Sequence, residues 1–237
     1  MLAFTAAACR NRGLQDIPPG HYEINPAGTG QLLEIRFNRG ESHNHPLMAI
    51  WAEDMEGNYI QTLYVARSIG TGIFEHGDPS SGKWMPGPIR RPAALPVWSH
   101  KRGIRAGDGL YVPDSTTAVP DAYTGATPAG NFIMAVRLDH RLEEKFRVLF
   151  EINQTWDWNE YWTNNKYPDN EAYKTSCQPA LVYEAVIDPG QPGREYPMEV
   201  IGHSHYAGED GEIYKDLTTM TTALKIVEEV VVKIREE

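Results

Sequence analysis

The sequence lacks the long apolar and basic segments that mark membrane-spanning and nucleic-acid-binding proteins. No stretch of about 18 or more apolar residues occurs, so no segment is expected to cross a membrane as a helix. No run rich in Lys and Arg occurs either, and the formal net charge of −10 would repel a nucleic-acid backbone. We therefore expect no nucleic-acid partner.

Cysteine is scarce, and the motifs of nucleotide binding and acyl transfer are missing. The only cysteines, Cys9 and Cys177, lie in such different contexts that no disulfide is expected, and Cys177 is predicted to be a buried thiol. The patterns G-x-S-x-G, G-x-G-x-x-G and the P-loop do not occur. We predict no catalytic residues and expect a protein that is not an enzyme.

Glycine and proline, in contrast, are abundant. The chain has 21 Gly and 17 Pro among 237 residues, and 41% of its residues are hydrophobic. Such a composition can bury a sizeable core, and it favours short strands and loops over a helical bundle. The segment of about 68–120 is especially rich in Gly and Pro. We expect it to be an irregular insertion that packs as a lobe of its own, with a short helix near 91–100.

Alternating and β-branched patterns predict at least seven strands. In 32–39, for example, Leu33, Ile35 and Phe37 alternate with polar residues. The C-terminal stretch fits a helix face or a strand face, and its valines and isoleucines favour the strand. An antiparallel β-sandwich is the simplest architecture, as one domain over 21–237. The predicted strands lie within 32–39, 46–67 (a hairpin), 131–139, 145–153, 180–188, 197–205 and 223–234.

The N-terminus resembles the end of a bacterial lipoprotein signal. A short apolar run closes with three alanines directly before Cys9, whose thiol would receive the lipid. We therefore expect residues 1–20 to be the signal end and a linker, and Cys9 to anchor the protein to a membrane. Because the basic start of such a signal is absent, a plain secretory signal or a cytosolic N-terminus are the alternatives.

Two pairs of histidines are candidate metal ligands. His43 and His45 are two residues apart, as are His203 and His205. Side chains at i and i+2 of a strand point to the same side, so each pair could present two imidazoles to zinc or copper. His203 and His205 are the stronger candidates because acidic residues follow them. Histidines in a polar loop with no ligand are the alternative.

The stretch "NQTWDWNEYW" at 153–162 is the densest aromatic segment of the chain. Flat rings beside Asn and Asp suit stacking on a sugar and hydrogen bonding to its hydroxyl groups. Trp156, Trp158 and Trp162 are therefore candidate glycan-binding residues. The alternative, commoner in β proteins rich in loops, is a structural plug whose rings lie in the core.

Two further segments resemble a known family. In "PLMAIWAEDMEGNYIQTLYV" (46–65), Trp51 precedes an acidic pair and a glycine turn, and "DAYTGATPAGNF" (121–132) resembles a second signature. Both are similar to a predicted periplasmic family, domain of unknown function 2271. The resemblance covers roughly residues 30–190. It implies an immunoglobulin-like β-sandwich in the periplasm or on a lipid tether. The family has no assigned catalytic residues, so no residue role follows from it.

These observations predict a non-catalytic β-sandwich protein of the bacterial cell envelope, in the periplasm or on the cell surface. Its expected work is binding or assembly with an envelope protein partner or a glycan. One alternative is a metal-binding or redox-accessory module that uses His203 and His205; the other is a glycan-binding module that uses the three tryptophans of the aromatic stretch.

Overall fold

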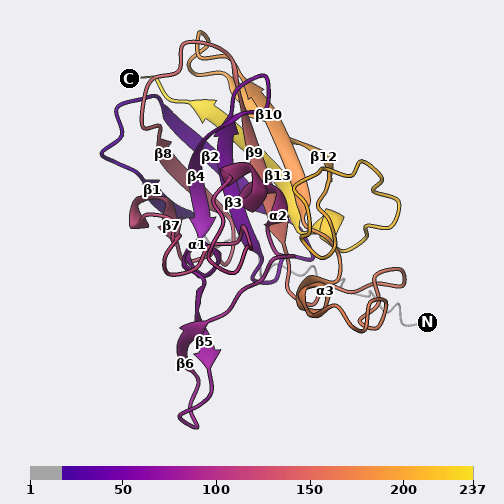
Figure 1. Cartoon of the computed structure of the whole chain (residues 1–237). Helices are drawn as coiled ribbons and strands as arrows, with labels where there is room; N and C mark the ends of the chain where they lie inside the picture. The colour runs from indigo at the N-terminus through magenta and orange to yellow at the C-terminus, as the bar shows by residue number, and fades with distance from the viewer. Residues whose placement is uncertain (1–17, 237) are drawn as a thin grey trace, which may run out of the picture.

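The computed structural model describes residues 18–236, which form two packed β-sheets with a further layer of loops and short helices on one of them (Figure 1). Cys9, the expected lipidation site, lies outside the described residues. None of the helices within the described range is long and apolar enough to span a membrane.

The first sheet has five strands. Their order across the sheet is β1 (Gly20–Ile24), β8 (Phe132–Arg137), β2 (Leu32–Arg39), β13 (Val227–Ile234) and β11 (Glu195–Pro197). β1 pairs with β8 in parallel, and the other neighbours are antiparallel. The ambiguous C-terminal stretch is thus a strand, β13, in agreement with its β-branched composition.

The second sheet has six strands. Their order is β12 (Glu199–His203), β10 (Leu181–Ile187), β9 (Phe146–Asn153), β3 (Leu47–Glu53), β4 (Tyr59–Ala66) and β7 (Thr124–Gly125). The expected hairpin of β3 and β4 is confirmed, whereas β4 and β7 pair in parallel. Both sheets are therefore mixed, and the prediction of a wholly antiparallel sandwich is wrong at these two edge strands.

The main core lies between the sheets. The alternation in β2 sends Leu33, Ile35 and Phe37 inward, and each is fully buried. Phe37 stacks on Phe132 of β8 at 4.7 Å between ring centroids and meets Phe150 of β9 edge to face at 6.0 Å. The contact with Phe150 joins the two sheets, because β2 and β8 lie in one sheet and β9 lies in the other.

The insertion covers the outer face of the second sheet. Trp51 and Leu149 of this sheet pack with Val97 and Trp98 of the insertion in a second buried cluster. Every residue of β3 is buried as a consequence. The insertion therefore is not the separate lobe that was expected. Its elements are α1 (Arg67–Thr71), β5 (Ile73–Asp78), β6 (Met85–Pro88), α2 (Pro96–Arg102) and the 3₁₀ helix η1 (Asp121–Tyr123).

Two parts project from the sandwich. β5 and β6 pair as an arm that extends from the body at the bottom of Figure 1. The loops around α3 (Glu171–Ser176) project beside the loops that join β12 to β13 (Figure 1). The second 3₁₀ helix, η2 (Ala223–Lys225), ends the latter loops. The aromatic stretch of the sequence belongs to this second projection.

Candidate functional site: an aromatic surface beside helix α3

The three tryptophans of the aromatic stretch separate into two environments. Trp156 and Trp158 are 61% and 58% exposed, whereas Trp162 is 6% exposed. Tyr161 is also exposed, and Lys166 Nζ lies 3.0 Å from the centroid of its ring. We call Trp156, Trp158 and Tyr161 the aromatic surface. The expectation that Trp162 binds a ligand by stacking is corrected, because its ring is buried.

The backbone beneath the aromatic surface is held on the segment that ends α3. Trp156 N–H donates to Thr175 O at 3.2 Å, and Asp157 N–H donates to Ser176 O at 3.0 Å. In return, Gln178 N–H donates to Asp157 O at 2.9 Å. Asp157 also forms a β-bridge with Cys177. Two exposed indoles thus stand on a fixed strip of backbone.

Trp156 has an unusual backbone conformation. Its φ is 58°, in the left-handed region that favours glycine and asparagine. A tryptophan held there is strained by roughly 1 kcal/mol, and its exposed ring gains little from burial in return. The surrounding hydrogen bonds therefore maintain a conformation that puts an indole into solvent.

The side chain of Asp157 holds the strip to the loop before β13. Its side chain is buried although its two sequence neighbours are exposed, and Oδ1 accepts the hydroxyl of Thr222 at 2.5 Å. Burial raises the pKa of Asp157, while bonds from Thr222 and Gln178 act in the opposite direction. Its second oxygen, Oδ2, has no hydrogen-bond partner among the described residues. The burial of Asp157 and its bond to Thr222 make it a structural residue.

Asn159 turns the chain between the exposed and buried rings. Its Oδ1 accepts the backbone N–H groups of Tyr161 at 2.9 Å and Trp162 at 2.7 Å. Its Nδ2 donates to Thr219 O at 2.9 Å and to Thr221 Oγ1 at 2.8 Å. These four hydrogen bonds hold the turn in which Tyr161 is exposed to solvent and Trp162 is buried.

The buried ring of Trp162 packs inside the loop. Its Nε1–H donates to Thr219 Oγ1 at 3.1 Å, and its ring lies 6.3 Å from Tyr173 and 6.2 Å from Tyr206. Tyr206 in turn stacks on Tyr167 at 4.1 Å. The segment therefore combines exposed rings, on Trp156 and Trp158, with a buried structural ring, on Trp162.

The histidine pairs do not share strand faces. His43 and His45 lie in the turn before β3, and His45 is exposed with a φ of 51°. His203 ends β12 and His205 follows it in a loop. Within residues 18–236, no group of three or more His, Cys, Asp or Glu side chains is placed to hold a metal ion.

The rings of the second pair take part in local packing. His203 Nδ1 bonds to Ser204 O at 2.7 Å, and its ring stacks on Tyr214 at 5.6 Å. His205 Nδ1 accepts the N–H groups of Ala207 and Glu209, both at 3.3 Å. These contacts shape the loop after β12.

Two buried acidic side chains, Glu151 and Glu53, contact the insertion. Glu151 of β9 is fully buried and binds the first turn of α2 through Val97 N–H at 3.1 Å and Trp98 N–H at 2.8 Å. Glu53 of β3 is also fully buried; it accepts Trp51 Nε1–H at 2.8 Å and lies 3.1 Å from Arg147. Both acids already have protein partners, so they are structural.

Comparison with known proteins adds no assignment. No protein-family model matches the chain, and neither a curated protein nor a solved structure matches it.

Proposed function

We propose that this protein is a non-catalytic β-sandwich that binds a glycan through the aromatic surface. The observation that carries the proposal is Trp156, whose strained backbone holds an exposed indole above a rigid strip. Strain that a fold maintains without a packing gain is typical of ligand-binding positions. Trp158 and Tyr161 supply further exposed rings on the same short segment.

The chemistry around the rings favours a sugar over a purely apolar ligand. Indole faces stack on the C–H faces of sugar rings, and their edges leave room for polar neighbours. The exposed polar residues on this segment are Glu160, Thr163, Asn164 and Asn165, which offer hydroxyl, amide and carboxylate partners to sugar hydroxyl groups. An envelope protein that docks on the same rings is the competing partner, and the binding experiment below separates the two.

A binding role is favoured over hydrolysis of the sugar. A glycosidase needs two carboxyl groups that face each other across the substrate. The two buried acids nearest in sequence are already engaged, Glu151 with α2 and Asp157 with Thr222. Glu160 is exposed, and the described contacts give it no partner acid.

The proposal includes a place in the bacterial cell envelope. Its support is the N-terminal stretch that resembles a lipoprotein signal, with Cys9 as the anchor, and the resemblance of 46–65 and 121–132 to domain of unknown function 2271. That resemblance also implies an immunoglobulin-like topology for the sandwich. Labelling with radioactive palmitate tests the anchor: the wild type should take up label, and Cys9→Ala should not.

Isothermal titration with a panel of oligosaccharides tests the glycan site. We expect at least one neutral oligosaccharide to bind the wild type, and Trp158→Ala to weaken that binding by about fivefold or more, since loss of a stacked ring removes roughly 1–3 kcal/mol. Trp84→Ala is the matched control, because Trp84 is 64% exposed on the β5–β6 arm. Equal loss in both variants, or no binding by the wild type, would refute the glycan site.

A further inference from the structure

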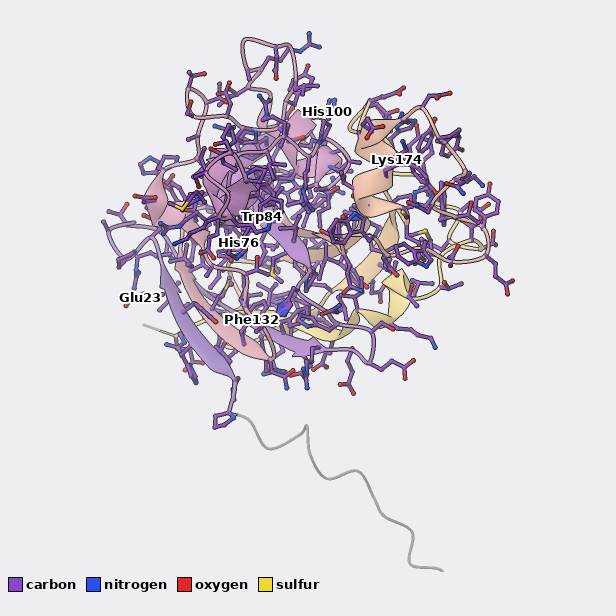
Figure 2. All side chains as sticks on the ribbon, turned by 90° about the horizontal axis from the view of Figure 1, so that it is seen from below. Glu23, His76, Trp84, His100, Phe132 and Lys174 are labelled. Carbon is purple, nitrogen blue, oxygen red and sulfur yellow. The ribbon has the colours of Figure 1, made fainter. Side chains whose placement is uncertain are left out.

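A cleft of about 360 Å³ opens between the insertion, α3 and the loop after β12. Figure 2 labels His100 on α2 and Lys174 on α3, the two helices beside it. The polar and aromatic side chains of its wall come from all three segments. They are Ser99, His100, Arg105, Tyr111, Asn170 and Glu209.

Close backbone contacts build the far wall of the cleft. A Cβ on Gly208 would lie 2.1 Å from Pro92 O, and the φ of Gly208 is 71°. A Cβ on Gly211 would lie 2.5 Å from Cβ of His100. Only glycine permits such an approach. The loop after β12 is therefore pressed against the insertion, so the cleft is part of the packed structure.

Arg105 is the cation of this cleft. Its guanidinium carbon lies 4.6 Å from the centroid of the Tyr111 ring, and it forms no ion pair with any residue in the described range 18–236. A guanidinium that stacks by its face keeps its N–H edge free for a bidentate bond to a carboxylate. By contrast, Arg90 of the same insertion already pairs with Asp108 at 2.8 Å.

His100 and Asn170 add defined hydrogen-bonding groups. His100 Nδ1 donates to Pro96 O at 2.8 Å, which leaves Nε2 as the ring nitrogen for a ligand. Asn170 Oδ1 accepts Tyr173 N–H at 2.9 Å, which leaves its amide N–H groups. Glu209 is exposed at the rim and accepts hydroxyl groups. Planar polar side chains of this kind suit the hydroxyl groups of a sugar.

The cleft and the aromatic surface are joined through short contacts. Arg91, beside wall residue Pro92, donates to Thr155 Oγ1 at 2.8 Å, and Thr155 precedes Trp156. On the other wall, Thr175 Oγ1 donates to Ala172 O at 2.8 Å, while Thr175 O accepts Trp156 N–H. The cleft and the aromatic surface are thus carried on directly bonded segments of the chain.

We propose that the cleft binds the carboxylate of a sugar acid, a uronate residue of the glycan that stacks on the aromatic surface; this inference rests on the proposed function. Arg105 binds the carboxylate, and His100 and Asn170 bind ring hydroxyl groups. The negative net charge of the protein repels a polyanion more strongly than a sugar that carries one carboxylate, so we expect isolated uronate residues in the ligand. The net charge is −10, but residues 67–125 hold seven Lys and Arg against five Asp and Glu, which gives 7 − 5 = +2 for the insertion.

The test compares matched acidic and neutral sugars. Isothermal titration measures xylo-oligosaccharides with and without a single glucuronate branch, on the wild type and on Arg105→Gln. The control is Arg194→Gln, because Arg194 is exposed and also lies over a tyrosine, Tyr196 at 5.0 Å. Circular dichroism and melting curves confirm that each variant is folded.

We expect the wild type and Arg194→Gln to prefer the acidic member of a pair by roughly tenfold or more, the range of a charge-assisted hydrogen bond. Arg105→Gln should bind both members alike, and Trp158→Ala should weaken both. Equal binding of acidic and neutral sugars by the wild type, or a preference that Arg105→Gln retains, would overturn this inference and leave the glycan site standing. If no sugar of either kind binds, both proposals fail.

Discussion

The side-chain carboxyl group of Glu151 in β9 accepts the backbone N–H of Trp98 in α2 at 2.8 Å. This bond, with its neighbour from Val97 N–H, ties the insertion to the sheet that it covers. Glu151→Ala leaves both N–H groups buried without an acceptor, so it should lower the free energy of unfolding by about 1–3 kcal/mol. Urea unfolding measures the loss. Glu160→Ala, at an exposed position, is the control, and equal stability of the two variants would contradict this role.

The same carboxyl group makes stability depend on pH. Burial raises the pKa of Glu151 to about 8 and outweighs the bonds from Trp98 and Val97, which lower it. The folded protein therefore binds this proton more tightly than the unfolded chain, in which the group titrates near pH 4.5. The resulting stabilisation is complete below about pH 4.5 and is lost as the pH rises to about 8.

Melting temperatures from pH 5 to pH 9 for the wild type and Glu151→Gln isolate this contribution, because the other titrating groups are common to both proteins. The difference in melting temperature should shift against the wild type as the pH rises, since glutamine stays neutral throughout. A difference that is constant with pH would show that Glu151 does not titrate in this range.

The buried and exposed tryptophans of one segment should respond differently to truncation. Trp162→Ala removes a ring that packs on Tyr173 and Tyr206, so we expect a loss of about 3–5 kcal/mol in the free energy of unfolding. Trp158→Ala removes a largely exposed ring and should change it by less than about 0.5 kcal/mol. Denaturant titrations of both variants measure this contrast, and a reversed order would refute the assignment of plug and surface.

A substitution at Trp156 tests whether its strained backbone conformation has a role in binding. Asparagine tolerates the left-handed backbone better than tryptophan does, so Trp156→Asn should raise the free energy of unfolding by up to about 1 kcal/mol. The same change should weaken glycan binding. Thermal unfolding and titration of one protein sample measure both quantities. A destabilised variant would mean that the indole contributes to packing and that its exposure has no functional origin.

Much of the sandwich follows from local patterns in the sequence. Alternation predicts β2, two apolar runs around a glycine turn predict the β3–β4 hairpin, and β-branched residues favour a strand at β13; the structure has all three. The edge strands β1 and β11 carry no such pattern because few of their residues are buried. Their parallel or antiparallel pairing depends on contacts with distant segments, which no local period records.

The packing of the insertion depends on distant contacts for the same reason. Its apolar residues are scattered along the sequence. Their core depends on long-range contacts, in which Trp98 of α2 is bonded to Glu151 and packs in one cluster with Trp51 of the sheet. Buried carboxylates look like surface residues in a sequence. Arg105 also carried no signal, since its importance lies in the absence of an ion pair among the described residues around the cleft.

The aromatic stretch was recognised from composition, but the roles of its members were not. Trp156 and Trp162 have the same side chain, and the difference between them arises from the β-bridge of Asp157 with Cys177 and the turn at Asn159. Asp157 and Cys177 are 177 − 157 = 20 residues apart, so local periodicity does not report their contact.

The indole N–H signals of the tryptophans in a ¹⁵N–¹H correlation spectrum give the most direct test of the glycan site. The chain has six tryptophans, and single Trp→Phe variants assign their signals. On addition of the oligosaccharide that binds best, we expect the signals of Trp156 and Trp158 to shift and those of Trp51, Trp84 and Trp98 to stay unchanged. Unchanged signals for Trp156 and Trp158 in the presence of a bound sugar would contradict this expectation.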